Sequence, residues 1–292
     1  MPRLGLQDAL IEFYRRLATE LPGDVEQALR AAVAAELLNS SDISALKTIL
    51  ASIEISRAES RPLCQDTGMP MFRVRLPRAF SPTEFSTVLR TATRIATAKV
   101  PLRPNAVDPI TGHNTGDGVG QGIPAVYFEE SGDDRIVVGG MLKGGGCENV
   151  TAIYKLPDEK LEAGRDLEGV CRCVLDAVAR AQGRACPPYV VGVGMGGALD
   201  TTAHLAKWQL MRKLTDVSPV SELAGMEGRL TGQANRLGIG PSGFGGATTV
   251  LAVKAASQHR HPASFFVVVS FACWACRRGM MSWQRDEVLY DI

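Results

Sequence analysis

The chain has 292 residues, of which 45% are apolar and 22% are charged, and its formal net charge at pH 7 is +1. A chain of this length and apolar content can bury a large core, as one big domain or two smaller ones. The near-zero net charge excludes a broad electrostatic attraction to nucleic acid or to an anionic membrane surface. The most apolar run, Ala263 to Ala275, is too short to cross a membrane and is typical of a buried strand.

The first sixty residues are predicted to be helical. From Leu4 to Leu21, charged residues alternate with apolar ones at helical spacing, which indicates an amphipathic helix and not a secretory signal. Seven cysteines, an odd number without a secretory signal, favour reduced thiols. We therefore expect a cytoplasmic protein.

Later segments mix strands and helices. Alternating apolar residues predict a strand over Phe72 to Leu76, and Ser81-Pro82-Thr83-Glu84 predicts the start of a helix that ends near Ala98. Spacing and turn residues predict further strands at 125–128, 135–138, 189–193, 248–253 and 265–271, and helices at 166–182, 199–214 and 222–237. This order predicts an α+β fold of irregular mixed α/β type, in one domain over residues 1–292 with a helical portion over about 1–60.

Three cysteines lie in polar turns rich in glycine or proline, where a buried structural thiol would be out of place: Cys64, Cys186 and Cys273. They are 122 and 87 residues apart, so only a folded chain can bring them together. Three thiolates leave one iron of a [4Fe–4S] cluster without a protein ligand. Such an iron is a Lewis acid that can bind a substrate hydroxyl. The pattern therefore predicts a hydro-lyase, not an electron carrier, with a cleft around the cluster.

A glycine motif offers an alternative function. Gly192-Val193-Gly194-Met195-Gly196-Gly197 matches G-x-G-x-x-G between a predicted strand and a predicted helix, as in a nicotinamide-dependent oxidoreductase. The acidic residue of that motif is missing, because Asp216 follows a helix and no βαβ unit is completed. Close packing of the strand on the helix, or an anion at the helix start, is the favoured interpretation.

A zinc-binding structural protein is the second alternative. Cys273 and Cys276 form a CxxC pair, to which Cys64 or Cys147 could add a ligand. Cys171 and Cys173 are two residues apart on a predicted helix and point to different sides. We expect them to be core or surface thiols.

Three further features suit binding and proton transfer. The glycines of Lys143-Gly144-Gly145-Gly146-Cys147-Glu148-Asn149 expose backbone N–H groups that could hold a carboxylate or a developing oxyanion, although a plain turn is also possible. His261 precedes Cys273 by twelve residues and is a candidate for proton transfer. Arg103 lies in a loop bounded by prolines and suits bidentate binding of a carboxylate.

In their order, these motifs resemble a known family. Together with Val191-Gly192-Val193-Gly194 and Asn235-Arg236-Leu237-Gly238-Ile239-Gly240-Pro241, they are similar to the alpha subunit, or amino-terminal domain, of class I fumarases and L-tartrate dehydratases. The resemblance covers about residues 8 to 279. It implies an iron–sulfur hydro-lyase acting on a four-carbon dicarboxylate.

The resemblance also assigns roles to residues. It implies that Cys64, Cys186 and Cys273 bind the [4Fe–4S] cluster, with one iron not bound by protein. It implies that the substrate is bound by Gln65, Asp66, Arg103, Gly144, Gly145 and Gly146. It implies that His261 is catalytic, and Asp66 is a second group that could move the proton.

The resemblance implies a partner as well. The family's active site is completed by a carboxyl-terminal domain with further arginines, a lysine and a threonine base, so we expect a beta subunit and an alpha–beta heteromer that dimerises. Cys147 is similar to the tartrate branch, whereas Glu148-Asn149 is similar to fumarases and Cys276 replaces a histidine of the tartrate branch. The balance favours L-tartrate, converted to oxaloacetate, over fumarate and malate.

Overall fold

The computed structural model describes residues 3–36, 41–285 and 287–292 and divides the chain into two compact units. Unit 1 comprises Met1–Gly23, Ala51–Gly145 and Ala275–Ile292, and unit 2 comprises Asp24–Leu50 and Gly146–Trp274. Each unit is therefore built from segments that are far apart in the sequence. Along the described ranges, no helix combines the length and apolar character needed to cross a membrane.

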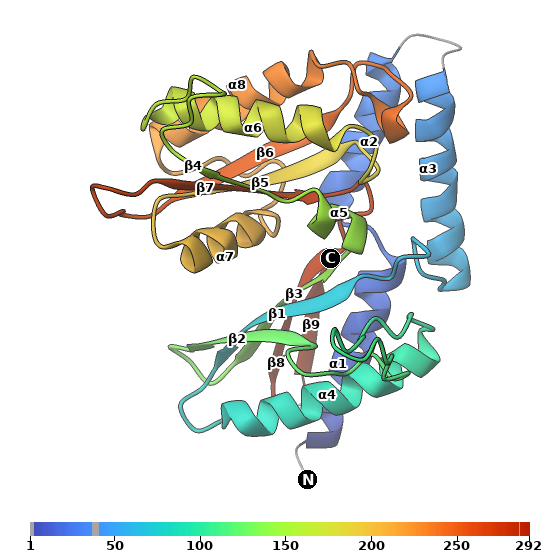
Figure 1. Cartoon of the computed structure of the whole chain (residues 1–292). Coiled ribbons are helices and arrows are strands. Elements are labelled where there is room, and N and C mark those ends of the chain that lie inside the picture. Colours follow the sequence, from blue (N-terminus) through green and yellow to red (C-terminus); the bar gives the residue numbers. More distant parts are fainter. Residues whose placement is uncertain (1–2, 37–40, 286) are drawn as a thin grey trace. The chain divides into compact units, whose positions relative to one another are not determined.

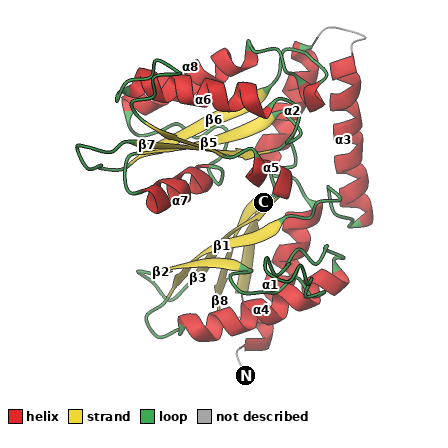
Figure 2. Cartoon of the chain, viewed as in Figure 1, coloured by secondary structure: helices red, strands yellow, loops and turns green. Residues whose placement is uncertain are grey.

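Helices and sheets are mixed, which confirms the predicted α+β class (Figure 2). The helices of the described residues are α1 (Arg3–Thr19), α2 (Gly23–Ala35), α3 (Ser41–Glu59), α4 (Pro82–Lys99), α5 (Gly145–Asn149), α6 (Leu167–Ala181), α7 (Leu199–Gln209), α8 (Ser221–Asn235) and the 3₁₀ turn η1 (Pro241–Gly243). The strands are β1 (Met69–Leu76), β2 (Ala125–Glu130), β3 (Ile136–Lys143), β4 (Ala152–Lys155), β5 (Tyr189–Met195), β6 (Val250–Ser257), β7 (Phe266–Ala272), β8 (Arg278–Gln284) and β9 (Glu287–Asp291).

Unit 1 contains a five-stranded sheet in the order β2-β1-β3-β8-β9, with β1 and β2 parallel and the other pairs antiparallel. The apolar sides of α1 and α4 pack on this sheet (Figure 1). Phe13, Phe72 and Phe85 are fully buried in the resulting core. α4 begins as predicted, because the Ser81 side chain accepts a backbone N–H of the first turn and Pro82 occupies the first helical position.

Unit 2 contains a four-stranded sheet in the order β4-β7-β5-β6. α7 covers one face and α6 and α8 cover the other (Figure 1). Strands covered on both faces are continuous apolar runs, and the central strands β5 and β7 are buried along almost their whole lengths. The sheet therefore places the loops at the two ends of β5 and β7 on a rigid support.

Four short elements were not predicted from the sequence: α5, β4, β8 and β9. α5 has five residues and begins among three glycines, which weaken a helix. β4 has only four residues. β8 contains the buried Arg278, so its apolar alternation is broken. Pairing with strands far away in the sequence, β7 and β3 respectively, and not local pattern, makes β4 and β8 extended, and β9 then pairs with β8.

The helix predicted over 199–214 ends at Gln209, which corrects the sequence analysis. Distant side chains of unit 2 satisfy the backbone beyond it. The Asp24 carboxylate accepts the N–H of Leu214 at 2.6 Å, and the Lys254 ammonium donates to the Leu214 carbonyl at 2.9 Å. The chain then passes through α8 to β6, which is parallel to β5. A crossover between parallel strands is thus present, although the sequence analysis expected none.

Candidate active site

The seven cysteines differ in exposure. Cys186 is exposed and Cys64 and Cys273 are partly exposed, whereas the other four are buried. Burial raises the pKa of the Cys173 thiol to about 12 and also raises the pKa of Cys171. Metal ligation needs a thiolate that iron can reach. The donor chemistry therefore fits a cluster held by the three accessible thiols.

Cys186 lies in a constrained turn between α6 and β5. Its φ of +56° is in the left-handed region, which residues other than glycine seldom adopt and which persists only where neighbours hold it. The Ala185 N–H donates to the Tyr189 hydroxyl at 3.3 Å, and this hydroxyl donates to the Gln182 carbonyl at 2.5 Å. The Cys147 thiol donates to the Ala185 carbonyl at 3.8 Å. Burial raises the pKa of Tyr189, so its hydroxyl remains a donor.

A glycine loop supports the same turn from another direction. The Ser242 N–H donates to the Pro187 carbonyl at 2.8 Å. Gly243 has a φ of +82°, and a Cβ on it would lie 2.8 Å from the Cα of Gly183. Only residues without a side chain allow the two backbones to approach this closely.

The Cys273 loop meets the Cys186 turn at one end of the unit 2 sheet. The Trp274 N–H donates to the Cys186 carbonyl at 3.3 Å. The sheet explains this contact, because β5 and β7 are antiparallel and Val190 pairs with Ala272. Antiparallel pairing therefore brings together two predicted ligands that are far apart in the sequence.

Unit 1 brings together the Cys64 loop and the glycine loop. Asp66 lies between them: its Oδ1 accepts the Gly68 N–H at 2.9 Å, and its Oδ2 accepts the Gly145 N–H at 2.8 Å. One of the three glycine N–H groups is therefore used by the protein's own carboxylate. The remaining predicted glycines flank it, Gly144 in unit 1 and Gly146 at the start of the next segment of unit 2.

Arg103 lies beside the Cys64 loop, as the sequence led us to expect for a shared site. Its Nε donates to the Gln65 carbonyl at 2.8 Å, and its backbone N–H donates to the Thr67 hydroxyl at 2.9 Å. The side chains of Arg103 and Gln65 are exposed. The fork of the guanidinium thus remains accessible from solvent while its Nε is fixed.

His261 is exposed and lies in the loop between β6 and β7. Its Nδ1 accepts the Ala263 N–H at 3.1 Å, so the neutral ring carries its proton on Nε2. The seven residues of β7 separate the His261 loop from Cys273 by roughly 20 Å at roughly 3.3 Å per residue. Twelve residues of sequence separation therefore do not bring His261 to the Cys273 of the same chain.

The two alternative functions are not supported. A Cβ on Gly192 or Gly194 would collide with backbone of α7, at Ala206 and Thr202 respectively. These glycines are needed for close strand–helix packing, which was the favoured interpretation.

For zinc, Cys276 is buried, and no group of three or more His, Cys, Asp or Glu side chains in the described part of the chain is arranged to hold a metal ion. A cubane differs from such a site because its ligands bind separate irons.

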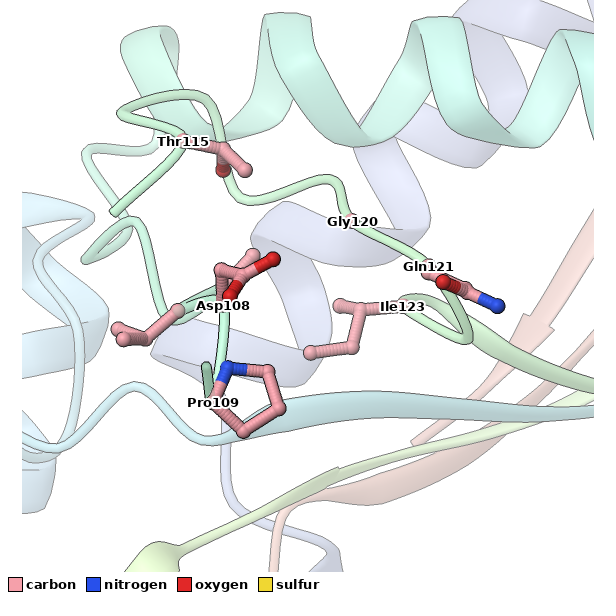
Figure 3. A pocket seen from close by; sticks show the side chains of 8 residues that line it. Asp108, Pro109, Thr115, Gly120, Gln121 and Ile123 are labelled. Carbon is pink, nitrogen blue, oxygen red and sulfur yellow. The ribbon is translucent and has the colours of Figure 1, made fainter. Parts of the chain in front are cut away.

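A cavity of about 130 Å³ in unit 1 is separate from these residues (Figure 3). The Asp108 carboxylate at its wall accepts the N–H groups of Thr111 and Ile110 at 2.8 and 2.9 Å, which hold the pKa of Asp108 below its usual range. Both hydrogen bonds are accepted by Oδ1, which is therefore used within the loop that carries Asp108. The cavity is lined by Ala106, Val107, Asp108, Pro109, Thr115, Gly120, Gln121 and Ile123.

Arg277 also belongs to this region, although it was not predicted from the sequence. Its Nη1 donates to the Asp66 carbonyl at 2.6 Å, and the residue is only 3% exposed. A charged residue in the run Cys276-Arg277-Arg278 suggests a surface position, so no local pattern indicated that it is buried beneath the Cys64 loop.

A family model and several known proteins match this sequence over most of its length. The family model described as fumarate hydratase (Fumerase) matches residues 7–282. A putative class I fumarate hydratase of Geobacillus stearothermophilus is 42% identical over 277 residues, which are 94% of this chain and 54% of that protein. A putative L(+)-tartrate dehydratase subunit alpha of Methanocaldococcus jannaschii is 36% identical over 98% of this chain and 100% of its own length. The L(+)-tartrate dehydratase subunit alpha of Escherichia coli (strain K12) is 34% identical over 98% of this chain and 93% of its own length. The chain thus spans about half of the first relative and nearly all of the other two.

Proposed function

The chain belongs to the fumarate hydratase (Fumerase) family, and from this membership we propose that it is the alpha-type subunit of an iron–sulfur hydro-lyase acting on four-carbon dicarboxylates. The observation that carries the proposal is the exposure of the cysteines. The three accessible thiols are the three that lie in polar turns, and the four others are buried.

In this proposal Cys64, Cys186 and Cys273 hold a [4Fe–4S] cluster. The cluster, when bound, supplies a Lewis-acidic iron without a protein ligand for the substrate hydroxyl. The constrained turn at Cys186 supports this role, because backbone strain is retained where a side chain must be held in one direction. Both units would then act as one catalytic domain over residues 1–292.

The chain's own polar groups bind and orient the dicarboxylate. The accessible fork of Arg103 suits a bidentate pair with one carboxylate, and its bond to the Gln65 carbonyl fixes its direction. Backbone N–H groups at Gly144 and Gly146, with the Gln65 amide, add hydrogen bonds. Asp66 is held by two N–H groups and retains lone pairs on both oxygens, so it is suited to move a proton at the departing or attacking water.

His261 suits the same proton transfer only from another copy of the chain. The separation of roughly 20 Å along β7 keeps it from the Cys273 of its own chain. We therefore propose that the alpha–beta unit dimerises and that the Nε2–H of His261 serves the site of the neighbouring copy. This assignment makes the dimer necessary for activity.

A beta subunit completes the site in this proposal. Two of the relatives are named as subunit alpha of a tartrate dehydratase. We expect the partner to supply further carboxylate-binding cations and the base that removes the C3 proton. Three of seven cysteines acting as thiolates favour a reducing compartment, the cytoplasm.

L-tartrate remains our expected substrate, because the residue that follows the glycine loop, Cys147, resembles that of the tartrate dehydratases. Cys147 is buried against Ala185 and not exposed to a substrate, so its effect on specificity is indirect. The test is a comparison of kcat/KM for L-tartrate, meso-tartrate, malate and fumarate, using the anaerobically reconstituted alpha–beta complex. Turnover of L-tartrate at least equal to that of fumarate supports the proposal. Preference for malate and fumarate overturns the choice of substrate, and a fully loaded complex inactive on all four overturns the function.

A further inference from the structure

Arg277 is a buried cation with few partners. It precedes β8 and is 3% exposed. Burying a guanidinium is costly unless hydrogen bonds or an opposite charge compensate it. Among the described residues, however, Arg277 has no ion-pair partner, and its Nε is a buried atom without a hydrogen-bond partner. Packing alone does not explain why an arginine occupies this position.

The side-chain contacts of Arg277 are directed at the Cys64 loop and the glycine loop. Its Nη1 donates to the Asp66 carbonyl at 2.6 Å, and its Nη2 lies 3.8 Å from the position that a Cβ on Gly144 would occupy. The backbone of Arg277 is itself fixed, because the Leu142 N–H donates to its carbonyl at 3.0 Å. The guanidinium therefore reaches the loop from a backbone position that is fixed against β3, immediately before β8.

Two consecutive carbonyls of the Cys64 loop are each held by an arginine. Arg103 Nε donates to the Gln65 carbonyl, and Arg277 Nη1 donates to the Asp66 carbonyl. Fixing two successive peptide planes sets the directions of the side chains between them and on either side. The fork of the exposed Arg103 is accessible to a ligand, whereas Arg277 is almost completely shielded from solvent.

We propose that Arg277 is a positioning residue, which fixes the Cys64-Gln65-Asp66 segment and places a positive charge beneath it. The charge favours an anion above the loop, such as the thiolate-bound cluster or a substrate carboxylate. The nearby Asp66 carboxylate, whose Oδ2 lies 3.1 Å from the same Gly144 Cβ position, forms no ion pair with Arg277. The part that concerns the cluster rests on the proposed function. The part that concerns the loop does not.

The test uses the chain without iron and measures alkylation of each cysteine by mass spectrometry at about pH 10, above the usual thiol pKa of about 8.5, so that the rate reports access to the thiol and not its ionisation. Arg277→Met removes the hydrogen bond and the charge, and Arg277→Lys keeps the charge without the planar fork. We expect Cys64 to be alkylated about tenfold faster in Arg277→Met and at an intermediate rate in Arg277→Lys, because a lost charged hydrogen bond frees the loop locally. Cys186 should stay within about twofold of its original rate.

Arg90→Met is the matched control. Arg90 also donates to backbone carbonyls of unit 1, those of Gly120 and Ile123 at 3.0 and 3.4 Å, but these belong to another loop. It should leave the Cys64 rate unchanged. Unchanged Cys64 alkylation in both Arg277 variants overturns the proposal, and so does an equal acceleration at Cys186, which would indicate general loosening.

A second readout concerns the loaded protein. Arg277→Met should release iron to a chelator about tenfold faster than the original chain, whereas Arg90→Met should not. Equal release from Arg277→Met and the original chain removes the role toward the cluster. A chain that takes up no cluster at all contradicts the proposed function instead, while the alkylation rates still decide whether Arg277 positions the loop.

Discussion

Replacing Gly243 by alanine should displace the Cys186 turn. A Cβ on Gly243 would lie 2.8 Å from the Cα of Gly183. Carbon atoms pack at roughly 3.5–4.0 Å, so the two backbones must separate by roughly 1 Å. Ser242, the preceding residue, donates its N–H to the Pro187 carbonyl at 2.8 Å. The displacement is therefore transmitted to the turn that carries Cys186.

The expected magnitude has two parts. Alanine in the left-handed conformation costs roughly 1–2 kcal/mol, and the collision adds roughly 1–3 kcal/mol, as for other overpacked sites. Gly245→Ala is the matched control, because Gly245 has a φ of +88° and no atom within 4 Å of its Cβ position. Gly245→Ala therefore has the cost of the left-handed conformation but not that of the collision. Urea unfolding should therefore show Gly243→Ala to be less stable than Gly245→Ala by roughly 1–3 kcal/mol.

The assay for function follows iron in anaerobically reconstituted protein. Gly243→Ala should lose iron to a chelator about tenfold faster than Gly245→Ala, which corresponds to roughly 1.4 kcal/mol. If both variants unfold at the same urea concentration and retain iron equally, the contact between Gly243 and Gly183 does not hold the Cys186 turn, and the reasoning is refuted.

Further predictions concern the ligands, the histidine and the partner. Cys186→Ser should abolish the iron–sulfur absorbance after anaerobic reconstitution and Cys171→Ser should retain it; a full-strength signal from Cys186→Ser would contradict the assignment. Co-expressed His261→Ala and Cys273→Ser chains should regain activity that neither has alone, because one copy supplies the histidine and the other the cluster. No recovery in mixed dimers would show that His261 does not act between copies. Activity should fall in air and return with ferrous iron and a reductant, since an iron without a protein ligand is open to oxidants. The chain alone should show little turnover until the beta subunit is added, and robust turnover without it would rule out an obligate partner.

Local signals predicted much of the fold. The cap at Ser81 begins α4, since its side chain accepts a backbone N–H of the helix. The helical spacing of apolar residues over 166–182 corresponds to α6. β7 was predicted from its continuous run of apolar residues. Such a run is expected for a strand whose sheet is covered on both faces. β8 was not, because Arg278 and Ser282 interrupt its apolar pattern and its extended form depends on pairing with β3, more than a hundred residues earlier.

The site was predictable where the signal is local. Cysteines in polar turns are accessible in the structure, as the residues around Cys64 and Cys186 indicated. His261 was expected near Cys273 because only twelve residues separate them in the sequence. Seven of the residues between them form the extended strand β7, which places the two at opposite ends of the strand. Arg277 was missed because a charged residue is usually exposed, and only the tertiary structure shows it beneath the Asp66 carbonyl.

The central claim is that three thiolates hold a cluster whose remaining iron meets the substrate. A Mössbauer spectrum of the alpha–beta complex, loaded with the Mössbauer-active iron isotope, tests this most directly. The account predicts four irons of which one changes its spectrum when L-tartrate or malate is added, and none changes with a monocarboxylate lacking the hydroxyl. Four irons that remain unchanged on addition of every dicarboxylate, or a complex that holds no iron–sulfur cluster, would contradict it.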